Sequence, residues 1–290
     1  MTVNFVVTSK PGDGLLFYSY EYCSHLNSEG IPASLCIIPH RHFAPGDYIR
    51  VLQDKYIHCN NLQFDDIEPK EDDISIIMGR SQLTLAHMTW NDFNSTQRLS
   101  LKRLFENKLI SVYSENHVNA YPVAIDFFRP KLVWNLCDKE VYPDGVGTHF
   151  EKTIHFDIYK DVKEENEYEH LFLGTNDIYY DAVNRVIDHY PDHGILVYKK
   201  QKLIDSPWSN NNHIFAPIHN LLGKFNTYVY TKPNFDPAPR LFQEFRWLGK
   251  KVIYERNKEL KDGGPIYWER GVQKQDITEI VNAVERLSKY

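Results

Sequence analysis

The start of the chain alternates between the composition of buried strands and that of a helix, which restricts the possible folds more than any other feature of the sequence. Val3–Val7 has the composition of a buried strand, and the apolar spacing from Leu15 to about Asn27 predicts a helix. Gly30 ends this helix, and Ser34–Ile38 predicts a second strand. Two strands joined through a helix form a βαβ unit with parallel strands and a right-handed crossover. The chain therefore begins as an α/β fold with a parallel sheet.

The same alternation continues to about residue 137. A helix is expected from Ser95 to Asn107, with Ser95 as its cap and Leu99 among its inward positions. Residues 39–70 are polar, and we expect an irregular loop there. The further strands expected in this half are Asp73–Met78, Leu109–Ser114 and Lys131–Cys137.

A second set of strands and helices follows a change in composition. Residues 161–169 are dense in charge and poor in apolar side chains, which predicts a domain boundary. We therefore expect one domain at 1–163 and another at 164–290. The main elements expected in the second half are His170–Leu173, Ile178–Tyr190, Gly194–Tyr198, Asn212–Ala216, Tyr228–Tyr230, Val252–Tyr254, Ile266–Trp268 and Ile277–Leu287.

The composition is that of a globular, cytoplasmic protein with reduced thiols. The chain is 42% hydrophobic and 25% charged, and it has neither a signal-peptide pattern nor an apolar run of membrane-spanning length. Its net charge of −6 makes nucleic acid a less expected partner, because such proteins usually present a basic surface. The cysteines have no metal-type spacing, so we expect packing residues rather than ligands at Cys23, Cys36, Cys59 and Cys137.

One stretch near the C-terminus, Asn234–Tyr254, combines a loop, a short helix, a glycine and a strand. Asp236 suits the helix N-cap, and Gly249 suits the left-handed position after the helix. Arg240 falls in the first turn, where the helix dipole disfavours a cation, and Glu244 lies one turn later. A ligand phosphate would resolve this conflict, and the carboxylate could hold the hydroxyls of a ribose. The alternative is an ordinary surface helix with a weak ion pair.

Three residues are candidates for a general base that activates an acceptor hydroxyl. Glu115 follows the expected strand Leu109–Ser114, so it would lie at the carboxyl edge of the sheet, where active sites of such folds lie. His117 lies on the same turn, and an imidazole takes a proton near neutral pH. Asp13 lies in the first glycine-containing loop. That loop lacks the third glycine of a dinucleotide fingerprint, so a tight turn is a better interpretation of it than an NAD site.

The segment with Pro239-Arg240, Glu244 and Gly249-Lys250-Lys251-Val252-Ile253 resembles the donor-binding segment of GT-B glycosyltransferases, and the C-terminal half follows the same order of elements. The nearest likeness is to the phage DNA β-glucosyltransferases and related sugar-nucleotide transferases, which makes a phage origin one implication. This resemblance implies two Rossmann-like α/β domains that face each other across a cleft. It also implies that the last helix packs at least partly near the first domain.

The resemblance also assigns roles to individual residues of the second half. The loop with Gly174 and Thr175 would face the diphosphate of the donor, and Tyr198 would flank its base. Ile218 would offer its backbone to the edge of the base. Arg240 and Glu244 would hold the phosphates and the ribose.

The function expected from these features is the transfer of a sugar from a nucleoside-diphosphate sugar, UDP- or GDP-linked, to an acceptor hydroxyl. The acceptor would be a glycan, a small molecule or modified DNA, and it would bind the first domain. No resident cofactor or metal is expected, because Arg240 and the helix terminus would stabilise the leaving diphosphate. The alternatives are a two-domain binding protein without catalysis and an NAD-dependent oxidoreductase.

Overall fold

The structure is a computed structural model that describes most of the chain, in two compact units. The described residues are 1–56, 59–78, 86–106, 108–113, 121–135, 162–175, 177–197, 213–216, 218–232, 240–255 and 275–287. One unit comprises Met1–His155 together with Lys274–Tyr290, and the other comprises Phe156–Gln273. The closing helix α9 (Thr278–Leu287) thus belongs to the first unit although it ends the chain.

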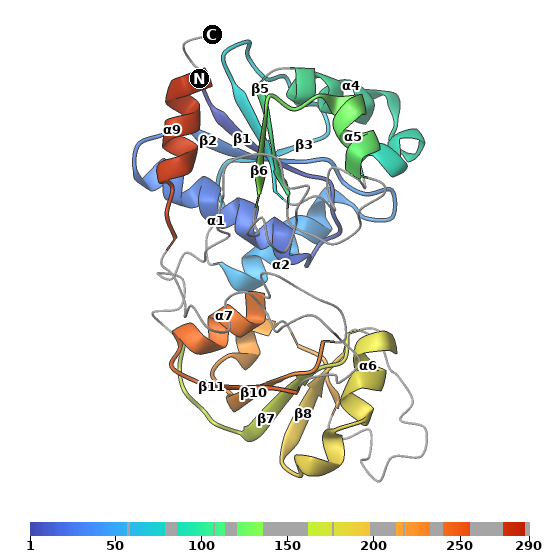
Figure 1. The fold of residues 1–290 in the computed structure, drawn as a ribbon, viewed down its shortest axis with the longest axis vertical. Coiled ribbons are helices and arrows are strands. Elements are labelled where there is room, and N and C mark those ends of the chain that lie inside the picture. Colours follow the sequence, from blue (N-terminus) through green and yellow to red (C-terminus); the bar gives the residue numbers. More distant parts are fainter. Residues whose placement is uncertain are drawn as a thin grey trace. The chain divides into compact units, whose positions relative to one another are not determined.

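The described strands of the first unit form one parallel sheet of six strands in the order β3-β2-β1-β4-β5-β6. Figure 1 shows this sheet with α1 and α9 on one side and α4 and α5 on the other. This arrangement buries both faces of the sheet, as an all-parallel sheet requires. The strands are β1 (Val3–Val7), β2 (Ala33–Ile37), β3 (Leu62–Phe64), β4 (Ile74–Ile77), β5 (Lys108–Tyr113) and β6 (Leu132–Asn135). The helices are α1 (Gly14–Ser28), α2 (Pro45–Lys55), η1 (Trp90–Asp92), α4 (Ser95–Glu106) and α5 (Tyr121–Phe128).

The expectation of an irregular loop at 39–70 is wrong, because this segment contains helix α2 and strand β3. Helix α2 begins at Pro45. Asp47 caps its N-terminus, since the Asp47 side chain accepts from the Ala44 N–H at 2.9 Å. Only Tyr48 and Leu52 of this helix are buried. An apolar stripe of two residues is too narrow to stand out among polar neighbours, so periodicity alone does not reveal the helix.

Two details of helix α4 also differ from expectation. Asn94 caps it in place of Ser95, since Asn94 Oδ1 accepts from the Gln97 N–H at 2.8 Å and Gln97 Oε1 accepts from the Asn94 N–H at 3.1 Å. Leu99 points outward and is 46% exposed. The expected inward positions Leu101, Leu104 and Phe105 are buried. The capping residue is therefore Asn94, one residue before the expected Ser95.

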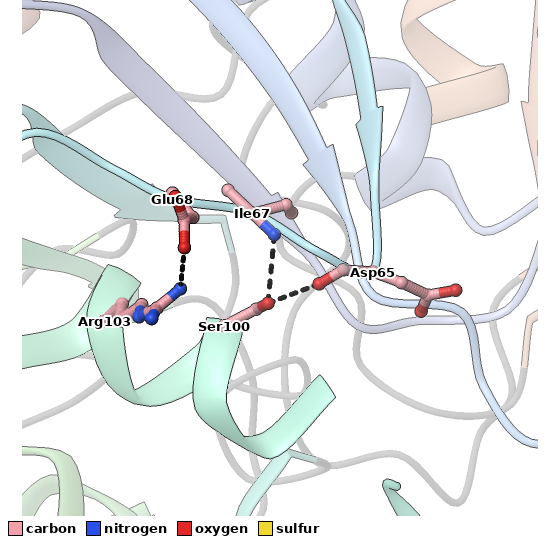
Figure 2. A network of polar contacts seen from close by, with 5 residues as sticks. All are labelled: Asp65, Ile67, Glu68, Ser100 and Arg103. Atoms are coloured by element: carbon pink, nitrogen blue, oxygen red, sulfur yellow. Dashed lines mark hydrogen bonds and ion pairs between the residues drawn. The ribbon is translucent and has the colours of Figure 1, made fainter. Parts of the chain in front are cut away.

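Helix α4 also fixes the turn that follows β3. Figure 2 shows the Ser100 hydroxyl between two backbone groups, donating to the Asp65 carbonyl and accepting from the Ile67 N–H at 3.0 Å. Arg103 Nη1 lies 2.7 Å from Glu68 Oε1 in the same view. These contacts tie the connection between β3 and β4 to helix α4.

The described strands of the second unit form a parallel sheet in the order β11-β10-β7-β8-β9. The expected helix at Ile178–Tyr190 is shorter and is followed by a separate 3-10 turn. The strands are β7 (Tyr168–Leu173), β8 (His193–Leu196), β9 (His213–Ile214), β10 (Phe225–Tyr230) and β11 (Lys251–Tyr254). The helices are α6 (Asp177–Asn184), η3 (Ile187–His189), η5 (Ile218–Leu221) and α7 (Arg240–Trp247). The strand expected at Ile266–Trp268 lies outside the described residues. None of the helices in the described part of the chain is long and apolar enough to cross a membrane.

Gly223 holds the start of the second unit against the turn before β10. The Gly223 carbonyl accepts from the N–H groups of Glu165 at 2.8 Å and Asn166 at 3.1 Å. A Cβ atom at this position would lie 1.8 Å from the Lys163 carbonyl oxygen. Two backbone segments therefore meet at a distance that only glycine permits.

We expect Gly223→Ala to lower the free energy of unfolding of the second unit by about 1–3 kcal/mol, because backbone must shift to admit the methyl group. Differential scanning calorimetry measures this as a lower transition temperature. Gly46→Ala is the matched control, since nothing lies within 4 Å of a Cβ atom there and the residue is in helix α2. The control should leave stability unchanged or raise it by up to about 1 kcal/mol. Equal melting of Gly223→Ala and the wild type would contradict the close approach.

Candidate functional site

The carboxyl edge of the five-stranded sheet gathers most of the residues expected to bind a nucleotide. Gly174 and Thr175 directly follow β7, and Ile218 begins η5 after the edge strand β9. Helix α7 connects β10 to the parallel strand β11, so it runs against the strands and begins at their carboxyl edge. Arg240 is its first residue. Ligands of open α/β folds bind at this edge.

Gly174 lets helix α6 and strand β8 approach the end of β7. Its N–H donates to the Leu196 carbonyl at 2.8 Å, which continues the pairing of β7 with β8. A Cβ atom at Gly174 would lie 2.8 Å from Ile195 Cγ2 and 3.0 Å from Tyr180 Cδ2. The absence of a side chain is therefore required for packing, whether or not a diphosphate binds the same loop.

Arg240 and Glu244 form a buried ion pair, and the alternative of a weak pair on a surface helix is wrong. Arg240 Nε donates to Glu244 Oε1 at 2.7 Å, and the two side chains are 9% and 1% exposed. Four successive residues of α7, from Phe242 to Phe245, are buried. Phe245 and Phe242 pack on Tyr228 and Tyr230 of strand β10.

The burial of this pair changes its energetics. Removal of two charges from water is costly, and their mutual attraction offsets the cost only with good geometry. Removal of one partner would leave the other charge buried, which typically destabilises a protein by about 3–5 kcal/mol. The Arg240–Glu244 pair is therefore a fixed unit rather than two independent side chains. As expected, Gly249 has a positive φ of 72° after this helix.

Asp13 caps helix α1 at the carboxyl end of β1 in the first unit. Its Oδ1 accepts from the Leu15 N–H at 3.0 Å. The capping bond holds the carboxylate beside the loop that contains Gly12, whose φ is 82°. The turn expected here is confirmed, and it presents one of the candidate bases at the edge of the sheet.

Several expected site residues lie outside what the structure describes. Glu115 and His117 follow β5 in a segment beyond the described residues, and Tyr198 follows β8 in another. The backbone of Ile218 is described in η5, but its side chain is not. These assignments stay predictions.

Residues that sequence reasoning missed hold the edge of the first unit together. The Tyr48 hydroxyl donates to the Ser9 carbonyl at 2.8 Å and accepts from the His40 N–H at 3.1 Å. Burial raises the pKa of Tyr48 to about 12, so the hydroxyl stays neutral. Gln97 Nε2 donates to the Pro39 carbonyl at 3.4 Å. The loops after β1 and β2 are thus fixed by side chains that come from helices, and no local motif in the sequence signals such a contact.

In the second unit, Tyr180 of α6 and His213 of β9 form a pair that sequence reasoning also missed. The Tyr180 hydroxyl lies 2.9 Å from His213 Nε2. Burial lowers the pKa of His213 and raises that of Tyr180 to about 12, so both groups are neutral near pH 7. The pair joins α6 to the edge strand next to the Gly174 turn.

No family model and no curated protein sequence matches the chain. Solved structures do match it over almost the whole of this chain. An alpha-glucosyltransferase in complex with UDP and a 13-mer DNA containing an HMU base has a TM-score of 0.55 and 12% identity, over 100% of this chain and 90% of that one. HepE of Anabaena in complex with UDP-glucose has a TM-score of 0.57 and 11% identity, over 99% of this chain and 89% of that one.

An enzyme with a different reaction shares the same fold. The UDP-GlcNAc 2-epimerase from Methanocaldococcus jannaschii has a TM-score of 0.50 and 10% identity, over 100% of this chain and 93% of that one. Identities this low establish the arrangement of the chain and leave its chemistry open. The expected fold, two Rossmann-like α/β units of the GT-B type, is thereby confirmed.

Proposed function

We propose that this protein is a glycosyltransferase that moves a sugar from a nucleoside-diphosphate sugar to an acceptor hydroxyl. The observation that carries the proposal is the buried Arg240–Glu244 pair at the start of α7, at the carboxyl edge of the second sheet. Structures of the same fold hold UDP or UDP-glucose. An arginine at a helix N-terminus suits a diphosphate, and a carboxylate suits the adjacent hydroxyls of a ribose.

The second unit would bind the donor. Glu244 is 1% exposed, so it would reach ribose hydroxyls only if the groups that cover it move when the donor binds. A carboxylate has about four lone-pair sites and would not need to give up its bond to Arg240. The backbone of the Gly174–Thr175 loop would meet the diphosphate, and Tyr198 and Ile218 would meet the base. The positive charge of Arg240 and the helix terminus would stabilise the leaving diphosphate.

The first unit would bind the acceptor and supply the base. Asp13, Glu115 and His117 are the candidates, and all follow strands at the carboxyl edge of the six-stranded sheet. The acceptor would be a glycan, a small molecule or modified DNA. The acceptor role would fall to the domain expected at 1–163 and the donor role to the domain expected at 164–290. Helix α9 is grouped with the first unit.

The direct test is incubation with a panel of UDP- and GDP-sugars, followed by mass spectrometry and NMR of the products. Release of the nucleoside diphosphate with transfer or hydrolysis of the sugar supports the proposal. A changed sugar configuration with the nucleotide still attached would identify an epimerase instead. A thermal shift with NAD and none with UDP or GDP would favour the oxidoreductase, and binding without turnover of any sugar would favour a binding protein.

We expect Glu244→Gln to weaken binding of the nucleoside diphosphate by about 1.5–3 kcal/mol, the range for hydrogen bonds to a charged group. Isothermal titration calorimetry gives the affinity, and circular dichroism melting gives the stability of the same sample. Glutamine keeps the shape of the side chain and an acceptor oxygen for Arg240, which alanine does not. Trp247→Ala on the exposed end of α7 (44% exposed) is the control and should retain affinity. Full nucleotide affinity in a folded Glu244→Gln protein would refute the role of Glu244.

We expect one of the variants Glu115→Gln, His117→Ala and Asp13→Asn to lower the transfer rate by about a hundredfold while donor affinity persists. Glu115→Gln is the first expectation, because Glu115 closely follows β5 at the carboxyl edge of the sheet. Asparagine is a good N-cap, so Asp13→Asn removes the base but keeps the bond to Leu15. Single-turnover rates at saturating donor separate the three. Full activity of all three variants would remove every candidate base.

We expect activity to persist when divalent cations are removed with EDTA, since Arg240 and the terminus of α7 supply the positive charge that the diphosphate needs. The transfer rate before and after chelation, and after MgCl₂ is restored, measures this. A loss that MgCl₂ reverses would show that Arg240 does not suffice.

A further inference from the structure

Four basic side chains meet at the carboxyl ends of β1 and β2, although the protein as a whole carries a net charge of −6. Lys10 follows β1, and His40, Arg41 and His42 follow β2. These four residues are called the basic cluster below. Lys10, Arg41 and His42 are exposed and His40 is half-buried. They lie at the edge that the proposed function assigns to the acceptor.

The loops that carry the basic cluster are held rigidly by buried groups. The Tyr48 hydroxyl bonds both the Ser9 carbonyl, next to Lys10, and the His40 N–H. Gln97 holds the Pro39 carbonyl from helix α4. Tyr48 has no exposed surface. The cluster is therefore fixed by the core of the unit, unlike lysines and arginines that happen to be near one another on a surface.

The side chains within the cluster contact one another. Arg41 Nε donates to His42 Nε2 at 3.0 Å, and the His40 and His42 rings lie 5.5 Å apart between centroids. Asp92 of η1 binds Arg41 Nη1 at 3.0 Å, yet the Arg41 side chain remains 53% exposed. Among the described residues, Asp92 thus offsets part of the positive charge that Lys10 and Arg41 bring to this edge.

The pKa of His40 depends on its burial and on these neighbours. Burial lowers its pKa, and His42, Lys10 and Arg41 lower it further, while Asp92 acts in the opposite direction. His40 Nδ1 is buried and has no hydrogen-bond partner among the described residues, so the ring would meet a ligand through Nε2. The ring is therefore neutral near pH 7 and becomes charged when an anion offsets the surrounding positive charge.

We propose that the basic cluster binds a terminal phosphate carried by the acceptor. The identification of this ligand as the acceptor rests on the proposed function. A phosphomonoester carries up to two negative charges and several acceptor oxygens, which match Arg41, Lys10 and the histidines. A phosphodiester carries a single charge and would use the cluster less well. The site thus selects a small phosphorylated acceptor over a polymer of phosphodiesters.

Binding of such a phosphate takes up a proton and depends on pH with a definite sign. The anion favours the protonated form of His40, so its pKa is higher in the complex than in the free protein. The part of the affinity that depends on the His40 proton is fully present below the pKa of free His40 and is lost as pH rises through the pKa of the complex. The phosphate opposes this at low pH, because its second ionisation has a pKa of about 6 and the monoanion would bind the cluster less well. Contacts of the phosphate with Lys10 and Arg41 do not need the His40 proton, so part of the affinity persists at higher pH.

The experiment is an NMR titration of the histidine rings with inorganic phosphate, glucose 6-phosphate, glucose and a short single-stranded thymidine oligonucleotide without terminal phosphate. We expect the His40 signals to move with the first two ligands and not with glucose, and the pKa of His40 to rise by about one on binding. A response to the oligonucleotide at least as strong per phosphate as that to glucose 6-phosphate would overturn the choice of a monoester. Unchanged His40 signals with both phosphate ligands would overturn the site.

Variants separate this site from general electrostatics and from the donor site. Lys10→Gln and Arg41→Gln should each weaken glucose 6-phosphate binding by roughly three- to tenfold. Lys102→Gln, an exposed lysine of helix α4, removes the same charge and should have no such effect; an equal loss would refute a localised site. UDP affinity should be unchanged in Lys10→Gln and Arg41→Gln. Retained UDP binding without phosphate binding overturns this inference alone, whereas phosphate binding at His40 without any donor turnover supports the site and refutes the transferase.

Discussion

In a parallel sheet every strand ends at the same edge, and this constraint determines where chemistry can occur in both units of the protein. Each connection must return the chain to the opposite edge, so the loops that follow the strands collect on one side. Asp13 and the basic cluster follow β1 and β2 of the first sheet. Gly174 and Arg240 occupy the corresponding edge of the second sheet. Within each sheet, the candidate residues are therefore brought to one edge by topology, although they are far apart along the chain.

The two edges are held in different ways. In the second unit, Arg240 and Glu244 of helix α7 form an ion pair, with 2.7 Å between Arg240 Nε and Glu244 Oε1. Both side chains are almost completely buried. Such a pair resists independent movement of its members, because separation would leave a buried charge. In the first unit the fixed groups are backbone atoms, which Tyr48 and Gln97 bind, and the charged side chains remain exposed. At the edge of the second sheet the charged side chains themselves are held in place, whereas at the edge of the first sheet the loop backbone is held.

The sequence reveals the strands far better than the contacts between them. Val3–Val7 is predicted to the residue, because a run of apolar side chains is a local signal. Helix α2 is missed, since two buried residues leave little periodicity. The i,i+4 spacing of Arg240 and Glu244 is visible in the sequence, but their burial depends on what packs around the helix. The Tyr48 hydroxyl bonds Ser9 and His40, which are distant in the sequence, so neither these bonds nor the basic cluster produce a local sequence pattern.

The difference between the edges has a consequence for charge. Arg240 is paired with a carboxylate in a buried setting, and an arginine keeps its proton over the physiological pH range, so the charge of the second edge would not change with pH. At the first edge, burial and the neighbouring His42, Lys10 and Arg41 lower the pKa of His40, and a bound anion would raise it again, so the charge there would vary. The proposed transferase would bind donor and acceptor and release both products in every cycle. A donor site of constant charge would respond little to pH, whereas a charge that forms on binding would make acceptor binding depend on pH and would disappear again when the anion leaves.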